Sequence, residues 1–189
     1  MMRTAAVILA AGQGTRMKSR LPKVLHRVVG RELVLWPVSS AQRLDVDEVV
    51  LVVGNGEAQV REVVGDDVAY VRQDQRLGTG HAVLQAREAL LGRTDAVLVL
   101  YGDMPALSWQ TIERLLATHE ANRPAMTILT VVSDDPMGFG RIVRDEQGVV
   151  KAIVEEAVAT PEVLAIKELN CGVYCFDAEW LWRGCQMCQ

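Results

Sequence analysis

A short apolar segment that runs into a glycine turn and then into several cations constrains this chain most. Residues 7–23 read VILAAGQGTRMKSRLPK, and the apolar run predicts a buried strand at 5–10. Gly12 and Gly14 have no Cβ atom, so backbone N–H groups in this turn can approach an anion closely. Four basic side chains follow, namely Arg16, Lys18, Arg20 and Lys23. The arrangement predicts a site for a polyphosphate.

Two well-known phosphate motifs do not fit this stretch. The dinucleotide motif G-x-G-x-x-G has its third glycine where Met17 stands, and its expected acid near the end of the second strand is missing around Asn55. The Walker A motif matches at Gly12, Lys18 and Ser19, but Met17 again replaces a required glycine. An ordinary strand-to-helix turn with a solvated basic loop remains an alternative on these residues alone.

Composition limits the range of partners. The chain has 189 residues, of which 50% are hydrophobic, and this is enough for one sizeable core. The net charge of −4 argues against a general nucleic-acid or membrane-surface binder, so the basic cluster suits a small anionic ligand. No apolar stretch approaches the ~20 residues of a membrane span, and the first residues do not resemble a signal peptide. We therefore expect a cytoplasmic protein.

Strand and helix patterns alternate along the first 132 residues. Strands are expected at 5–10, 48–53, 68–71, 96–101 and 125–132, and helices at 33–44, 57–64, 79–91 and 108–121. Ser108 is the expected N-cap of the last of these helices. Near-continuous apolar strands that alternate with helices are typical of parallel sheets covered on both sides. The predicted fold class is α/β, with a Rossmann-like, mainly parallel sheet and helices on both faces.

Beyond Ser133 the pattern changes. Strands are expected at 141–144, 149–154 and 169–176, and a helix is expected to open at 180–182. The turn residues at 145–148 (DEQG) predict a β-hairpin, which we interpret as a small flap inserted beside the main sheet. The whole chain, 1–189, is interpreted as one domain, with a nucleotide-binding core at 3–132 and the flap and its strands at 133–177.

Three segments that follow predicted strands carry the candidate ligand-binding residues. They are the glycine turn, the stretch QDQRLGTG at 73–80 and the stretch YGDMP at 101–105. Because ligands of open α/β sheets bind beyond the carboxyl ends of the strands, we expect these segments to converge on one cleft.

Asp103 is the candidate metal ligand. One carboxylate at a strand end can hold Mg²⁺, because phosphate oxygens and water complete its coordination. The alternative is a turn aspartate that caps nearby backbone. Gln73, Gly78 and Thr79 can offer amide and backbone groups to a base, or form a glycine hinge before a helix. His81 is interpreted as a structural residue in the first helical turn.

The four cysteines are Cys171, Cys175, Cys185 and Cys188, and the last two form a C-x-x-C pair. A zinc site is one interpretation of this pattern. However, Cys171 and Cys175 are expected on one strand, where positions four apart are about 13 Å from each other, too far to share one ion. Reduced thiols are therefore predicted.

Five stretches, in order, resemble the sugar-1-phosphate nucleotidyltransferases, and among them the uridyltransferase domain of the GlmU family. They are LAAGQGTRM with LPKVL (9–17 and 21–25), Gln73 with LGTGHA (77–82), YGDMP (101–105), GFGRI (138–142) and ELNCG (168–172). The resemblance covers about 4–177. It implies the nucleotide-diphospho-sugar transferase fold, UTP and N-acetylglucosamine 1-phosphate as substrates, and Mg²⁺ as cofactor. It also implies a role in cell-wall precursor synthesis and a homo-oligomer in the longer proteins.

The resemblance also implies roles for the matching residues. Those that would surround the nucleotide are Leu9, Ala10, Ala11, Gly12, Gly14, Gln73, Gly78 and Thr79. Those that would neutralise phosphates in catalysis are Arg16 and Lys23, and Asp103 would ligate Mg²⁺. Those that would hold the amino sugar are Gly140, Glu155 and Asn170.

The chain departs from the family pattern in three places. Glu156-Ala157-Val158 follows Glu155 where the family has a basic residue close behind, and Cys171 stands where a threonine is usual. The asparagine that supplies a second Mg²⁺ contact, and the acetyltransferase β-helix, fall outside the 189 residues. We therefore expect a C-terminally incomplete domain without acetyl transfer.

Two alternatives remain: a nucleotidyltransferase for another sugar or base, and a nucleotide-binding module without catalysis. Met17 opposes a dehydrogenase.

Overall fold

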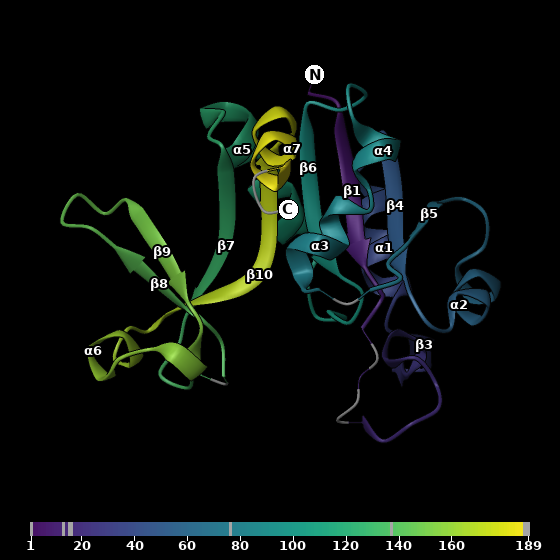
Figure 1. Ribbon diagram of the computed structural model, residues 1–189, viewed down its shortest axis with the longest axis horizontal. Helices are drawn as coiled ribbons and strands as arrows, with labels where there is room; N and C mark the ends of the chain where they lie inside the picture. Colours follow the sequence, from purple (N-terminus) through teal and green to yellow (C-terminus); the bar gives the residue numbers. More distant parts are fainter. Residues whose placement is uncertain (1, 13, 15–16, 76, 137, 187–189) are drawn as a thin grey trace. The chain divides into compact units, whose positions relative to one another are not determined.

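The computed structural model describes residues 2–12, 14, 17–75, 77–136 and 138–186 (Figure 1). The chain divides into two compact units. Unit 1 comprises Met1–Thr127 and Tyr174–Gln189, and unit 2 comprises Ile128–Val173. The strands β7 (Met126–Val132) and β10 (Glu168–Asp177) contribute residues to both units.

Unit 1 is built on a mainly parallel sheet. Its strands are β1 (Thr4–Leu9), β4 (Glu48–Val53), β5 (Ala69–Arg72) and β6 (Ala96–Tyr101). They lie in the order β5-β4-β1-β6 and are parallel, and β10 follows antiparallel to β6 with Tyr174 opposite Val99. All six residues of β1 are buried, as expected for a central strand covered on both sides.

Helices cover both faces of this sheet. The helices α3 (Thr79–Leu84), α4 (Arg87–Leu90) and α7 (Ala178–Gln186) pack with β1, β4 and β6 in one hydrophobic cluster. That cluster takes Ala5, Val7 and Leu9 from β1. The alternate residues Ala6 and Ile8 point to the other face, where α1 (Leu35–Arg43) contacts β1 and packs on α5 (Trp109–Asn122) (Figure 1). The predicted α/β class with helices on both faces is confirmed.

Most predicted elements of unit 1 are confirmed. The bounds of β4, α2 (Glu57–Val64) and β6 coincide with the predicted ranges, and the other strands and α1 differ by one or two residues at an end. The Oγ of Ser108 accepts a hydrogen bond from the N–H of Thr111 (3.2 Å), so the predicted N-cap of α5 is also confirmed.

The prediction of one helix over 79–91 is wrong, because α3 ends before Gln85 and α4 begins at Arg87. The side chain of Gln85 donates to the carbonyl of His81 (3.0 Å), the acceptor that its backbone N–H would use in a continuing α-helix. That N–H turns instead to Ala82 O (3.2 Å), and Ala86 N bonds Val83 O (3.0 Å). These tighter bonds to the third residue back interrupt the α-helical geometry.

A small hairpin after the first loop was not predicted. The 3₁₀ turn Lys23–Leu25 leads into β2 (Arg27–Val28) and β3 (Arg31–Glu32), which pair antiparallel. The two turn residues, Val29 and Gly30, both have positive φ (54° and 76°), as a type I′ turn requires. A β-branched residue is rare in this conformation, so Val29 concealed the turn in the sequence.

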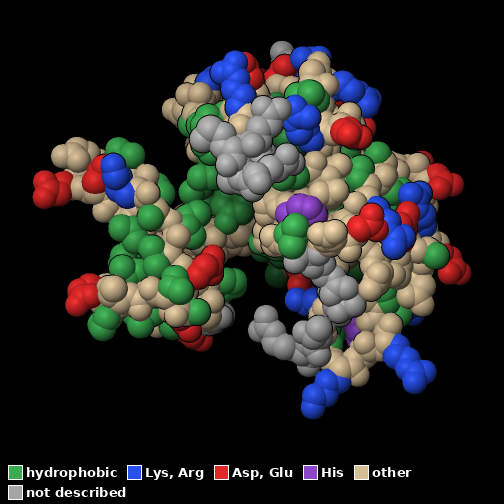
Figure 2. Space-filling view, in the orientation of Figure 1, with side chains coloured by type: hydrophobic (Ala, Val, Ile, Leu, Met, Phe, Trp, Pro, Cys, Tyr) green, Lys and Arg blue, Asp and Glu red, His purple; other side chains and the backbone are tan. Residues whose placement is uncertain are grey.

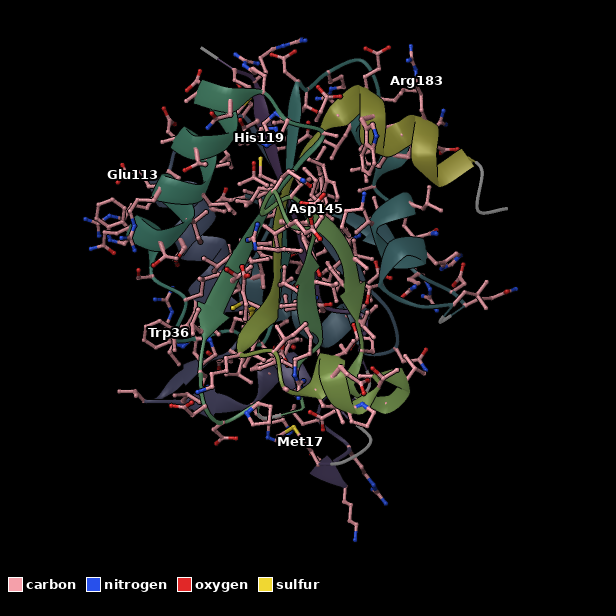
Figure 3. The ribbon with its side chains drawn as sticks, turned by 90° about the vertical axis from the view of Figure 1, so that its left-hand side faces the viewer. Met17, Trp36, Glu113, His119, Asp145 and Arg183 are labelled. Atoms are coloured by element: carbon pink, nitrogen blue, oxygen red, sulfur yellow. The ribbon has the colours of Figure 1, made fainter. Side chains whose placement is uncertain are left out.

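His119 is a buried histidine on α5 (Figure 3), 2% exposed. Its Nδ1 lies 2.9 Å from the Oγ1 of Thr127, and burial lowers the pKa of His119 below its ordinary value. The imidazole therefore fills a neutral, structural position between α5 and the sheet.

Unit 2 is antiparallel. The strands β8 (Arg141–Arg144) and β9 (Val150–Val154) form the predicted hairpin, and Leu169 of β10 lies opposite Arg141. A 3₁₀ turn, Glu156–Val158, and the short helix α6 (Pro161–Leu164) connect β9 to β10. In the hairpin turn, Asp145 Oδ1 accepts from the N–H groups of Gln147 and Val149.

Within the described ranges, no helix combines the length and apolar character needed to cross a membrane. Lys and Arg side chains are interspersed with Asp and Glu on the visible face (Figure 2). This mixture agrees with the small net charge and gives no broad field of one sign.

Candidate functional site

A cavity of about 680 Å³ lies in unit 1 beside the carboxyl ends of its parallel strands. Its described lining residues are Leu9, Ala11, Gly12, Gly14, Met17, Lys23, Val24, Gln73, Gly78, Thr79, Ala82, Tyr101 and Asp103. They come from the segments after β1, β5 and β6, so the predicted convergence of these three segments on one cleft is confirmed.

Close backbone packing fixes the start of the glycine loop. Ala10 N donates to Val52 O (2.8 Å), and Gly102 N donates to Leu9 O (2.9 Å). A Cβ on Gly102 would lie 3.1 Å from Leu9 O and from a methyl group of Val24. Gly102 thus lets the loop after β6 approach the loop after β1. Ala10 is buried beside the cavity but is not among its described lining residues.

Gly14 determines where Lys23 lies. Gly14 has φ +59°, and a Cβ there would be 2.7 Å from the Cβ of Lys23. Pro22, the residue before Lys23, is held in the same way, because a Cβ on Gly56 would be 2.5 Å from Pro22 Cγ. Contacts below 3 Å are not tolerated between carbon atoms, so glycines are required at both positions. The first carbons of the Lys23 side chain are therefore positioned by close packing against the glycine loop.

Lys23 and Asp103 form an ion pair within the cavity lining. Their side chains are 42% and 23% exposed, and an ion pair with this exposure contributes at most about 1 kcal/mol. A phosphate group can replace the carboxylate as the partner of Lys23, and a divalent cation can replace the ammonium as the partner of Asp103. The pair is thus readily exchanged for a metal-bound polyphosphate.

The donor set fits Mg²⁺ rather than a metal held by the protein alone. In the described part of the chain, no group of three or more His, Cys, Asp or Glu side chains is placed to share an ion. Mg²⁺ needs only one or two carboxylates when phosphate oxygens and water supply the rest of the octahedron. Asp103 offers one carboxylate at the wall of the cavity.

Gln73 also lines the cavity and is 6% exposed. Its backbone N–H donates to Val53 O (2.8 Å), and its Nε2 donates to Gly78 O (3.2 Å) and lies 3.0 Å from Nδ1 of His81. Thr79 Oγ1 and the hydroxyl of Tyr101 are 3.5 Å apart. The three residues predicted to face a base are therefore brought together by one hydrogen-bonded turn.

The three residues implied for the sugar meet in unit 2. Asn170 N donates to Gly140 O (2.8 Å), and a Cβ on Gly140 would lie 3.3 Å from Oε1 of Glu155. The Oδ1 of Asn170 accepts from Gly172 N (3.0 Å). Gly140 immediately precedes β8 and Glu155 immediately follows β9, so antiparallel pairing of these strands places them side by side.

Arg141 follows Gly140 directly in the chain and has a buried side chain. Its side chain is 2% exposed, and its Nη2 lies 3.1 Å from Oε2 of Glu156. Its Nη1 donates to the carbonyl of Phe139, and its Nε has no hydrogen-bond partner among the described residues. Glu156, where the chain departs from the family pattern, is therefore the ionic partner of a buried guanidinium.

Some predicted residues fall outside this account, and some lining residues were not predicted. Arg16 lies outside the described residues. Met17 (labelled in Figure 3), Val24, Ala82 and Tyr101 line the cavity without having been assigned a role. Each lies in or directly beside a stretch that the sequence assigned to ligand binding. This neighbourhood was the signal that could have identified them as lining residues.

The described cysteines are not placed for metal binding. Cys171 is half-buried on β10, and Cys175 on the same strand is fully buried. Burial raises the pKa of the Cys175 thiol to about 12, which keeps it protonated. The side chains of Cys185 and Cys188 lie outside the described residues.

Two solved structures share the fold. A 4-diphosphocytidyl-2C-methyl-D-erythritol synthase from Anaerococcus prevotii aligns with a TM-score of 0.70 at 18% identity, covering 98% of this chain and 76% of that one. A protein assigned as a glucose-1-phosphate thymidylyltransferase, from Bacillus anthracis, aligns with a TM-score of 0.77 at 18% identity, covering 95% and 73%. At this identity the likeness shows the fold alone.

Sequence relatives are much closer. The chain is 49% identical over 179 residues to the bifunctional protein GlmU of Halalkalibacterium halodurans, covering 95% of this chain and 39% of that protein. It is 48% identical over 184 residues to the GlmU of Listeria innocua, covering 97% and 40%. The chain thus spans about two fifths of the length of these relatives. The family model of the MobA-like NTP transferase domain matches residues 6–156. On this match across most of its length, the chain belongs to the family of MobA-like NTP transferase domains.

Proposed function

We propose that this chain transfers the uridylyl group of UTP to N-acetylglucosamine 1-phosphate, giving UDP-N-acetylglucosamine and pyrophosphate. Membership of an NTP transferase family and the identity to GlmU proteins support the reaction type and the substrates. The product would serve cell-wall precursor synthesis, and we expect the reaction to take place in the cytoplasm.

The observation that carries the proposal is the exchangeable ion pair of Lys23 and Asp103 at the wall of the 680 Å³ cavity. One site then offers a cation for phosphate, a carboxylate for Mg²⁺, and the backbone at Gly12 and Gly14. The buried amide of Gln73 and the turn at Gly78 lie in the same lining and suit the base.

The proposed chemistry needs no general base. A phosphate oxygen of the sugar phosphate attacks the α-phosphorus of UTP, and the bond from that phosphorus to the pyrophosphate oxygen breaks. The attacking oxygen is already anionic at neutral pH, so the protein contributes by positioning the two substrates and stabilising charge. This requirement agrees with a lining that holds a cation, a carboxylate and backbone donors.

We assign residues of unit 1 to the nucleotide and residues of unit 2 to the sugar. In unit 1, Leu9, Ala10, Ala11, Gly12 and Gly14 would surround the nucleotide, with Lys23 and Arg16 on its phosphates. Asp103 would hold Mg²⁺, which neutralises charge on the phosphates when bound. In unit 2, the amide of Asn170, the carboxylate of Glu155 and the backbone at Gly140 would meet the hydroxyl and acetamido groups of the sugar.

The test is pyrophosphate release from UTP and N-acetylglucosamine 1-phosphate, with and without Mg²⁺. Release that requires both substrates and the metal is the expected result. Parallel reactions with CTP and with glucose 1-phosphate separate this reaction from that of another sugar-1-phosphate nucleotidyltransferase. UTP binding by calorimetry without release would identify a nucleotide-binding module instead, and neither binding nor release would overturn the proposal.

A further inference from the structure

The turn behind the cavity contains a short hydrogen-bond chain that links Gln73 to His81. The amide nitrogen of Gln73 contacts two atoms, Gly78 O at 3.2 Å and His81 Nδ1 at 3.0 Å. Gln73 lines the cavity and is 6% exposed, whereas His81 is not among the described lining residues. His81 therefore stands behind the residue that meets the ligand.

The chemistry of these atoms fixes the orientation of the Gln73 amide. A backbone carbonyl only accepts, so the group that faces Gly78 O must be the amide NH₂. Its second hydrogen then points to His81 Nδ1, which must carry a lone pair. This hydrogen bond requires the tautomer in which the ring proton is on Nε2. The remaining polar atom of the amide, Gln73 Oε1, points away from these two partners, and Gln73 lines the cavity.

The helix that carries His81 is itself held in place. The side chain of Gln85 donates to the carbonyl of His81 (3.0 Å), and its Nε2 is 3.4 Å from His81 Nε2. This contact anchors the backbone at His81 and leaves Nδ1 free to accept from Gln73.

We propose that His81 is a positioning residue that selects the base by keeping Gln73 Oε1, a hydrogen-bond acceptor, turned toward the cavity. This inference rests on the proposed function. An acceptor there pairs with the N3–H of an imide base such as uracil. Cytosine presents a lone pair at N3, so in the same pose it faces the oxygen without a hydrogen bond. Without the acceptor at His81, the Gln73 amide keeps only its hydrogen bond to Gly78 O. It can then flip, which exchanges the positions of its oxygen and its nitrogen.

The first experiment measures Kd for UTP and for CTP by calorimetry, in wild type and in three variants. His81→Leu removes the acceptor, and we expect the preference for UTP over CTP to fall about five- to tenfold, the worth of one hydrogen bond. His81→Asn returns an acceptor oxygen near the Nδ1 position and should recover most of the preference. Glu88→Ala, at an exposed position on the neighbouring helix α4, is the control, and the preference should be unchanged.

The second measurement concerns the tautomer directly. Nitrogen NMR of the wild-type imidazole should show an unprotonated Nδ1 and a protonated Nε2 at neutral pH. A proton on Nδ1, or an unchanged UTP preference in His81→Leu, would overturn the inference. Failure of the proposed function is distinguishable, because it appears as absent pyrophosphate release from the wild-type chain whatever the tautomer and the binding ratio.

Discussion

The cavity of unit 1 and the sugar cluster of unit 2 are held in different ways. In unit 1 the sheet beneath the cavity is almost fully buried, and the glycine loop is fixed by contacts that leave no room for a Cβ at Gly14, Gly56 or Gly102. In unit 2 the residues around Gly140 are fixed by ion pairs. Arg141 pairs with Glu156, and Arg144 makes two 2.7 Å bonds to Glu168.

The strands of the two units differ in burial. The β8–β9 hairpin is only partly buried, whereas β1 and β6 are almost fully buried. Both units expose large hydrophobic side chains, such as Val132 (74%) and Val158 (76%) in unit 2 and Val29 (90%) in unit 1. In unit 1, close packing positions the side chain of Lys23. Unit 2 is a small antiparallel unit with few buried side chains, and it depends on ion pairs instead. Substitutions should therefore lower the stability of unit 1 mainly through steric conflict and that of unit 2 mainly through the loss of ion pairs.

The largest effect is expected at Asp103. Asp103→Asn keeps the shape of the side chain but removes the charge, so Mg²⁺-dependent turnover should fall about 10²- to 10³-fold, or ~3–4 kcal/mol of transition-state stabilisation. The melting temperature should change little, because the lost ion pair is partly exposed. The measurement is pyrophosphate release beside a thermal melt. Asp134→Asn, which removes the exposed pair with Lys167, is the control, and equal losses in both variants would contradict the metal role.

Glu156→Gln should destabilise unit 2 by about 3 kcal/mol, because it leaves the buried guanidinium of Arg141 without its ionic partner. Amide hydrogen exchange should accelerate in β8 and β9 and stay slow in β1 and β6. Arg144→Leu, whose side chain is 41% exposed, should cost less than about 1 kcal/mol. Equal effects of the two changes would show that burial of the charge does not matter.

Gly14→Ala should destabilise the chain by about 1–2 kcal/mol, because an L-residue is strained at φ +59° and the new Cβ meets Lys23. Denaturant unfolding measures the loss. Gly12→Ala is the matched control for stability, since a Cβ on Gly12 meets no described atom within 4 Å. If both substitutions cost the same, positioning of Lys23 by close packing is refuted.

The smallest effect is a pH dependence from Glu168. Its hydrogen bonds with Arg144 lower the pKa of Glu168 from its ordinary value near 4.5. A depressed carboxyl pKa gives stability that is present above the unfolded-state pKa and is lost as the pH falls through the folded one. Below about pH 4.5 we expect a loss of up to ~1 kcal/mol. Glu168→Gln should lack this component of the acid unfolding curve, and identical curves would contradict the assignment.

The sequence predicted what depends on periodicity and on strand ends. Apolar runs located β4 and β6, and the rule that ligands bind beyond the carboxyl ends of strands correctly placed Gln73 and Asp103 in one cleft. It could not predict the pairing of Lys23 with Asp103, which depends on how two distant loops pack. It also missed the break at Gln85, which arises from a single side-chain bond to the carbonyl of His81.

The buried thiol of Cys175 gives the fold a chemical reporter. Cys175 lies opposite Leu98 where β10 pairs with β6, is 0% exposed and stays protonated because its pKa is raised to about 12. Alkylating reagents attack thiolates, so they reach this sulfur only when a local opening of the fold exposes it. The rate of alkylation at Cys175 therefore reports transient openings around β10.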